Sequence, residues 1–348
     1  THQPISRCTL LISVRRLCHR FEFVAPIELL GANRISLTLN AIDTMGCLAE
    51  PVPHEKVKDM LPVWINGWRL FAVIAAVITT FMLFRLGSTD SSSPQDVSAM
   101  IQYSVRWAVP FIFLVIATSA LFKLFPSRLT RWLLWNRRYL GLCFAVAMAW
   151  QGAFIFIVSF SHSAHYYGEI YLLRDELEGS SGYLFLAAMT LTSFGFFRRR
   201  ISAEQWRFLH LSGVIFLWAY PFSVYWWNVF YYQTQHWFDW LFYMLGYTAF
   251  ALRILAWGKE RGGVPGAGIR LWIGGGLVLL SLVLAVSGHV WQPALSTALL
   301  APLWSAELEL WLPFWPFEPF LPLLVMAVGV WTTTSETAYN GSLERATA

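Results

Sequence analysis

RRYLGLCFAVAMAWQGAFIFIVSF, residues 137–160, opens with two arginines and then carries no charge. An α-helix needs about 20 mostly apolar residues to cross the hydrocarbon core of a bilayer. The stretch therefore predicts a membrane-spanning helix with a basic end. Segments of the same kind recur along the chain, and those we expect to span are Val63–Phe84, Ala99–Phe122, Tyr139–Phe160, Tyr183–Phe197, Arg207–Phe230, Trp237–Trp257, Leu271–His289 and a weaker one near Phe317–Thr333.

The composition agrees with this pattern. Of the 348 residues, 57% are hydrophobic and 13% are charged, and the mean hydropathy is +0.51. Soluble domains carry about 25% charged residues, so this chain lacks the polar surface of a soluble protein. We expect an all-α polytopic integral membrane protein, a bundle of about eight transmembrane helices with the lipid bilayer as its partner. The Tyr183–Phe197 segment reaches spanning length only if its flank from Leu177 joins the helix.

The net charge of +5 does not indicate nucleic-acid binding, because the basic residues lie in short loops between apolar segments. The stretch 123–138 and the run Arg198–Arg200 are basic, whereas the loops 87–98 and 161–180 are poor in lysine and arginine. The positive-inside rule then places the N-terminus and every basic loop in the cytoplasm. Eight spans put the C-terminus inside as well, and seven would put it outside.

Residues 1–59 differ from the rest of the chain. Their apolar pieces are short and are interrupted by arginine and histidine between residues 15 and 20. They do not show the pattern of a secretory signal peptide. We expect an N-terminal extension that is disordered or not native, and we hypothesise that the natural chain begins at Met60 or Met45.

Prolines recur at every third residue near the C-terminus. They are Pro313, Pro316, Pro319 and Pro322. Because proline removes a backbone donor and clashes with the preceding turn, this spacing opposes a regular helix. A polyproline-like interfacial segment over Trp311–Leu323 is expected, with membrane entry near Phe317. Three acids flank it, and we interpret them as solvated groups at the outer interface: Glu307, Glu309 and Glu318.

His210 is the only histidine within the first turns of a clearly apolar span. Ser202 and Gln205 have the spacing of a capping box, which predicts that the helix begins at the membrane surface, about two turns before His210. A lone imidazole inside a membrane is costly unless it has a ligand or a partner. His210 is therefore the residue that most needs an explanation.

Four short motifs follow one another along the chain. RWAVPF stands at 106–111, RRYLGL at 137–142, LTS at 191–193 and WRFLHL at 206–211. In these places the stretch 106–257 resembles the ferric reductase-like transmembrane family, and within it the heme-binding membrane subunit of the bacterial methionine sulfoxide reductase system. The resemblance implies a six-helix core over residues 60–257, a C-terminal extension with one or two further spans over 258–348, and a location in the bacterial inner membrane.

The resemblance also implies b-type heme, bound through histidines on the third and fifth helices. His210 matches the first ligand of the fifth helix. The other two ligand positions hold Gln151 and Ser223, and an amide or hydroxyl is a poor axial ligand compared with neutral imidazole. Three roles for His210 follow: ligand of one heme, structural residue hydrogen-bonded to a side chain such as Gln151, or interfacial histidine without a special role.

These observations favour a divergent member of the family, which transfers electrons across the membrane if heme b is retained. The donor would be a separate redox partner protein or quinone, because no soluble stretch is long enough for a flavin or nucleotide domain. The alternatives are a heme-free membrane scaffold or partner subunit, and a transporter or lipid-interacting protein. Catalytic residues are not identified.

No metal site is expected. His162 and His165 lie at adjacent helical positions but lack a third ligand at a suitable spacing. The four cysteines show no ligand spacing either. Arg106, set into a span, is expected to reach the interface or to pair with an acid.

Overall fold

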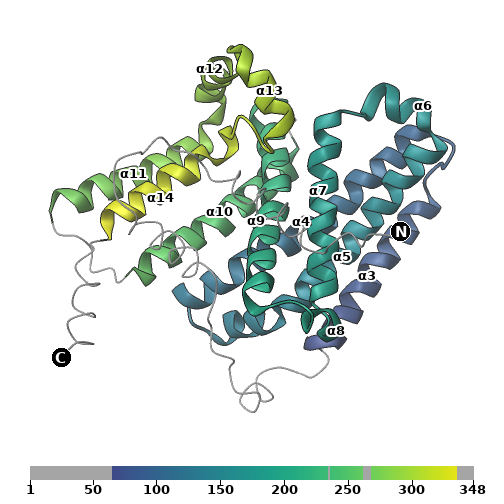
Figure 1. Ribbon diagram of the computed structural model, residues 1–348, viewed down its shortest axis with the longest axis horizontal. Helices are drawn as coiled ribbons and strands as arrows, with labels where there is room; N and C mark the ends of the chain where they lie inside the picture. Colours follow the sequence, from purple (N-terminus) through teal and green to yellow (C-terminus); the bar gives the residue numbers. More distant parts are fainter. Residues whose placement is uncertain (1–64, 234–235, 262–267, 335–348) are drawn as a thin grey trace, which may run out of the picture. The chain divides into compact units, whose positions relative to one another are not determined.

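The computed structural model describes residues 65–233, 236–261 and 268–334 (Figure 1). The expected extension over residues 1–59 and the hypothesis about its start lie outside this range. The longer helices in the described residues are α3 (Gly67–Gly87), α4 (Pro94–Leu124), α5 (Arg128–Ser161), α7 (Leu173–Thr192), α9 (Ala203–Phe230), α10 (Trp237–Glu260), α11 (Ile269–Val286), α12 (Gly288–Leu300) and α14 (Leu321–Thr333). Shorter helical pieces are α6 (Ser163–His165), η3 (Tyr166–Ile170), α8 (Gly195–Arg198), α13 (Leu303–Trp311) and η4 (Glu318–Phe320).

The all-α membrane architecture is confirmed. Six helices in the described residues are long and apolar enough to cross a bilayer: α3, α4, α5, α9, α10 and α11. The two other expected spans also correspond to helices. Helix α7 is long enough but carries Arg174, Asp175 and Glu176 near its start, and α14 has 13 residues. The flank before Tyr183 does join its helix, which ends at Thr192 rather than at Phe197.

Capping residues fix the starts of the two helices that matter most for the site. The Ser127 hydroxyl accepts a hydrogen bond from the Thr130 amide, and the Thr130 hydroxyl accepts one from the Ser127 amide. Ser202 and Gln205 form the same reciprocal pair at the start of α9. Each box satisfies amide groups that a helix start leaves without partners. The capping box expected before His210 is therefore confirmed.

Helix α4 lies at the centre of the bundle and packs against α5, α10 and α9, while α3 packs on α5 and α7 packs on α9. The interior is strongly aromatic. Trp218 stacks on Phe222 and Phe250, with ring centroids 4.8 and 4.3 Å apart, and its indole N–H donates to the Gly246 carbonyl at 3.0 Å. A Cβ at Gly246 would lie 2.8 Å from Phe113, so the glycine permits this close aromatic packing.

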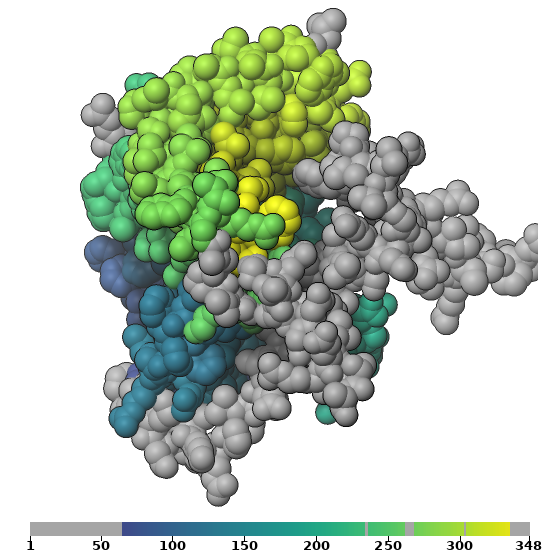
Figure 2. All heavy atoms as spheres, turned by 90° about the vertical axis from the view of Figure 1, so that its left-hand side faces the viewer, coloured from purple at the N-terminus to yellow at the C-terminus, as the bar shows by residue number. Residues whose placement is uncertain are grey.

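Helices α11 and α14 form a separate pair that also contacts α10. Gly274 and Gly329 face each other so closely that a Cβ on either would lie 2.6–2.8 Å from the carbonyl oxygen of the other. Small residues allow helix backbones to approach in this way inside a membrane. Figure 2 shows the yellow-green residues of the C-terminal helices gathered on the surface, apart from the blue residues of α4 and the start of α5.

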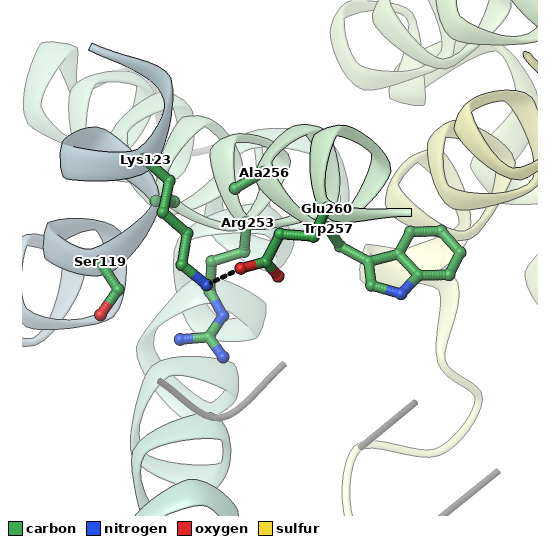
Figure 3. Close-up of a pocket in the computed structure, with 7 residues that line it drawn as sticks. Ser119, Lys123, Arg253, Ala256, Trp257 and Glu260 are labelled. Carbon is green, nitrogen blue, oxygen red and sulfur yellow. Dashed lines mark ion pairs between the residues drawn. The ribbon is translucent and has the colours of Figure 1, made fainter. Parts of the chain in front are cut away.

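The end of the bundle where α4 and α10 finish is called the basic end here, and the other end the opposite end. At the basic end Lys123 forms an ion pair with Glu260, and the Lys259 ammonium donates to the Lys123 carbonyl at 2.7 Å. Figure 3 shows Lys123 reaching the Glu260 carboxylate while Arg253 points into the same pocket. The cavity measures about 20 Å³, room for roughly one water molecule and not for a metabolite.

The proline-rich segment differs from the expectation. Residues 312–316 form turns, the 3₁₀ helix η4 follows, and α14 begins at Leu321. Pro319 and Pro322 each stand in the first turn of a helix, where the missing N–H has no intrahelical partner to lose. The segment is thus a series of turns rather than a polyproline stretch, because two of its prolines start helices.

One of the three acids near this segment is buried, and a second is partly exposed and forms an ion pair. Glu309 pairs with Arg174 at 3.0 Å. Glu318 is 1% exposed, and neither of its carboxyl oxygens has a hydrogen-bond partner among the described residues. The side chains of Gln292 and Ser296 are its polar neighbours. Glu307 is exposed, as expected.

Candidate functional site

The candidate site lies at the basic end, where α7 finishes and α9 begins. His210 stands in the second turn of α9, partly buried. Its Nε2 atom is 3.0 Å from the hydroxyl oxygen of Thr192, the last residue of α7. This side-chain hydrogen bond joins the end of α7 to the start of α9.

The hydrogen bonds of Thr192 fix the role of the histidine nitrogen. The Thr192 hydroxyl donates its proton to the Ala188 carbonyl at 2.7 Å. The Met189 carbonyl, at 3.3 Å, is a second acceptor for this proton. With the proton on a carbonyl of its own helix, the hydroxyl accepts from the tautomer of His210 that carries a hydrogen on Nε2. A protonated ring nitrogen has no lone pair in the ring plane to offer to a metal. In this arrangement the nitrogen that faces α7 is a hydrogen-bond donor.

Trp206 completes the cluster. Its ring stacks on the imidazole of His210 with centroids 4.2 Å apart and planes 28° apart, and its indole N–H donates to the Thr192 carbonyl at 3.3 Å. The guanidinium of Arg198 lies 5.2 Å from the centre of the Trp206 ring, within the range of a cation–π contact. One face of His210 is thus covered by an indole, and both residues are fixed to the end of α7.

Gln151 is bound to a different part of α7. Its side-chain oxygen lies 3.2 Å from the Tyr183 hydroxyl, whose one proton is shared with the Met148 carbonyl, also at 3.2 Å. Tyr183 and Thr192 are nine positions apart on one helix, which separates the two contact points by about 14 Å along its axis. Gln151 and His210 therefore meet different residues at different depths, and Thr192 rather than Gln151 is the partner of His210.

Ser223 is directed at its own helix. Its hydroxyl donates to the Ala219 carbonyl at 2.8 Å, and the side chain is buried. This hydrogen bond within one helix satisfies the hydroxyl without any contact across the bundle. The three family ligand positions are thus each occupied in a local hydrogen bond, and they do not converge.

These residues do not fit a heme. Nε2 of His210 is hydrogen-bonded to Thr192, an indole covers the His210 ring, and Gln151 is engaged by Tyr183. No pair of these positions presents two nitrogen ligands to a common point. What the arrangement does chemically is to hold the α7–α9 junction together through neutral hydrogen bonds and ring stacking.

The other sites considered from the sequence are also held locally. The His162 ring contacts the Ser91 carbonyl at 3.1 Å, whereas His165 contacts Glu169 at 3.1 Å. In the described part of the chain no group of three histidine, cysteine or acidic residues could hold a metal.

Near His165, burial and the hydrogen bond to Glu176 raise the pKa of Tyr166 to about 12. Arg106 stacks over Phe238 at 4.0 Å instead of pairing with an acid.

Thr192 and Tyr183 matter here and were not singled out from the sequence, and Glu318 was interpreted as a solvated acid. Thr192 belongs to the LTS motif, which precedes the helix of His210, so the sequence order could have indicated that the two residues lie near each other. Tyr183 stands at the start of an apolar run and gave none. Glu318 lies between two prolines, which suggested a solvated turn, although the apolar residues on both sides argued for burial.

Comparison with known proteins adds no relative. No family model matches the sequence, and no curated protein and no solved structure is similar to it.

Proposed function

We propose that this chain is a heme-free relative of the ferric reductase-like membrane proteins, which acts as a scaffold or partner subunit rather than as an electron carrier. The family assignment rests on the four sequence motifs. The loss of redox function is supported above all by one observation: Nε2 of His210 and the hydroxyl of Thr192 are hydrogen-bonded at 3.0 Å. A histidine that serves as a structural hydrogen-bond donor keeps the helix junction intact without a cofactor.

The bundle suits a scaffold in two further ways. Its interior is filled by stacked aromatic rings around Trp218, and its basic end is closed by the contact between Lys123 and Glu260. A rigid, well-packed core presents its outer residues to a partner in a fixed arrangement. The partner would be a separate membrane or redox protein.

A reduced-minus-oxidised absorbance spectrum tests the proposal. We expect the protein purified from heme-replete cells to show no b-type band, and His210→Ala to leave the spectrum unchanged. A b-type band that disappears in His210→Ala would overturn the heme-free assignment and restore electron transfer. Thr192→Val is the matched variant, because it frees His210 while keeping the shape of the residue. If this variant alone acquires a heme band, the hydrogen bond is what excludes the cofactor.

The proposal includes a location in the bacterial inner membrane with the basic end in the cytoplasm. The charge of the loops supports this orientation. Alkaline phosphatase is active only outside the cytoplasm, so a fusion in the loop after α3 should be active and a fusion after Arg200 inactive. The reverse pattern would invert the topology.

A further inference from the structure

A second polar site lies at the opposite end of the bundle, between the end of α3 and the first half of α4. Residues from both helices line a cavity of about 210 Å³. Its charged members are Arg85, Asp96 and Arg106, and Ser88, Thr89 and Tyr103 add hydroxyl groups. This lining differs from the aromatic packing around Trp218.

The two arginines lack acidic partners within the described residues. Neither forms an ion pair there, although Asp96 lines the same cavity. Arg106 stacks over the Phe238 ring at 4.0 Å, a contact that orients a guanidinium without neutralising it. Two positive charges and one negative charge leave the cavity with a net charge of +1, which favours an anion.

The helix lengths place both arginines at one edge of the bilayer. Gly67 to Arg85 and Arg106 to Leu124 each cover 18 steps, or about 27 Å of helix. That length nearly matches the hydrocarbon core of about 30 Å. With the basic end at one membrane surface, Arg85 and Arg106 reach the other. Stacked aromatic residues beside them, Phe81 on Trp107 at 4.9 Å, are typical of this depth.

An apolar stripe leads away from the cavity along α3. Val77, Phe81 and Phe84 are 43%, 46% and 80% exposed, and their spacing puts them on one face of the helix. The stripe runs from beside Arg85 toward the middle of the membrane. A molecule with an anionic head and an apolar tail would therefore contact the arginines and this face of α3 at the same time.

We propose that this cavity binds a phosphate group, and that its source is the headgroup of an anionic phospholipid. Phosphate oxygens accept hydrogen bonds from guanidinium groups in paired geometry. The hydroxyls of Ser88 and Thr89 already donate to the Arg85 carbonyl at 2.8 Å each, so the arginines are the main donors left for the ligand.

Intact-protein mass spectrometry of the full chain in mild detergent, titrated with dioleoyl phosphatidylglycerol, tests this site. The double variant Arg85→Gln/Arg106→Gln should bind at least about tenfold more weakly, because each charge-assisted hydrogen bond is strong. Arg69→Gln, at the other end of α3, is the control and should bind like the natural protein. Asp96→Asn should bind more tightly, because it removes the acid from the cavity.

Two further probes separate the possible sources of the phosphate. Dioleoylglycerol, which has the tails without the phosphate, should not bind measurably at this site. Inorganic phosphate at millimolar concentration should not displace the lipid. Displacement by inorganic phosphate would overturn the lipid as the source, and equal binding by the double variant would overturn the site itself. Arg85→Lys/Arg106→Lys keeps the charge and should restore part of the affinity, which a folding defect would not.

Discussion

His210 and Glu318 are two polar side chains buried to different degrees at two helix junctions, and their surroundings are opposite in character. At the α7–α9 junction, His210 has a hydroxyl partner at 3.0 Å and an indole stacked on its ring. At the junction of α12 and η4, Glu318 is almost completely buried and its oxygens have no hydrogen-bond partner among the described residues.

The difference shows that a polar residue in an apolar stretch of sequence is not always the side chain that lacks hydrogen-bond partners in the fold. His210 stands out in the sequence because it interrupts a span, yet its polar atom facing α7 is satisfied. Glu318 stands among prolines, where an acid is expected in water, yet it is almost completely buried, with Gln292 and Ser296 as its polar neighbours. An uncompensated buried carboxyl costs free energy, whereas a hydrogen-bonded imidazole costs little.

The largest expected effect is at Glu318. Glu318→Gln removes the ionisable group and adds an amide that can donate to its neighbours Gln292 and Ser296. We expect the free energy of unfolding to increase by about 2–3 kcal/mol. Denaturant unfolding in detergent, followed by tryptophan fluorescence, measures it. A decrease would contradict the comparison, because it would mean that the carboxylate is compensated after all.

At His210 the expected change has the opposite sign. Thr192→Val keeps the shape of the side chain but removes the acceptor, which leaves the Nε2–H without a partner. The free energy of unfolding should fall by about 1–2 kcal/mol. Thr190→Val on the same helix is the control and should change it much less. If both variants behave alike, the His210 contact is not what stabilises the junction.

A smaller effect is expected where α5 meets α7. Tyr183→Phe removes the hydroxyl that donates to Gln151 and to the Met148 carbonyl, and it should cost about 1 kcal/mol. Combining it with Gln151→Leu in a double-mutant cycle isolates the pair. Since this contact and that of His210 lie about 14 Å apart along α7, the Tyr183 and Thr192 variants should be additive. Strong coupling between them would show that α7 moves as one unit when either contact is lost.

The smallest effect is expected at Glu309. Its ion pair with Arg174 is partly exposed, with side-chain exposures of 28% for Arg174 and 47% for Glu309. Exposed pairs contribute little, so Glu309→Gln should lower the free energy of unfolding by about 0.5 kcal/mol. The loss should shrink further at high salt, because screening weakens such pairs. Set beside Glu318→Gln, the same substitution in two places should change stability in opposite directions.

Much of the fold could be predicted from the sequence, because spanning helices reveal themselves through local apolarity. The capping box before His210 was predictable for the same reason, since both of its residues lie within one turn. The hydrogen-bond partners of side chains on different helices were not predictable in this way. The expected contact of His210 with Gln151 depended on two helices being neighbours, and α7 supplies a partner to each of them instead. The burial of Glu318 depends on α12 covering it, which the polarity of the neighbouring residues in the sequence does not show.

The closeness of Gly274 and Gly329 has a consequence for the surrounding lipid. Helix α14 has 13 residues and is about 20 Å long, shorter than an ordinary bilayer core of about 30 Å. Because its backbone lies close to that of α11, it cannot slide along α11 to reduce this mismatch. We therefore expect the protein to prefer thin membranes, and its thermal stability in bilayers to fall as the acyl chains lengthen.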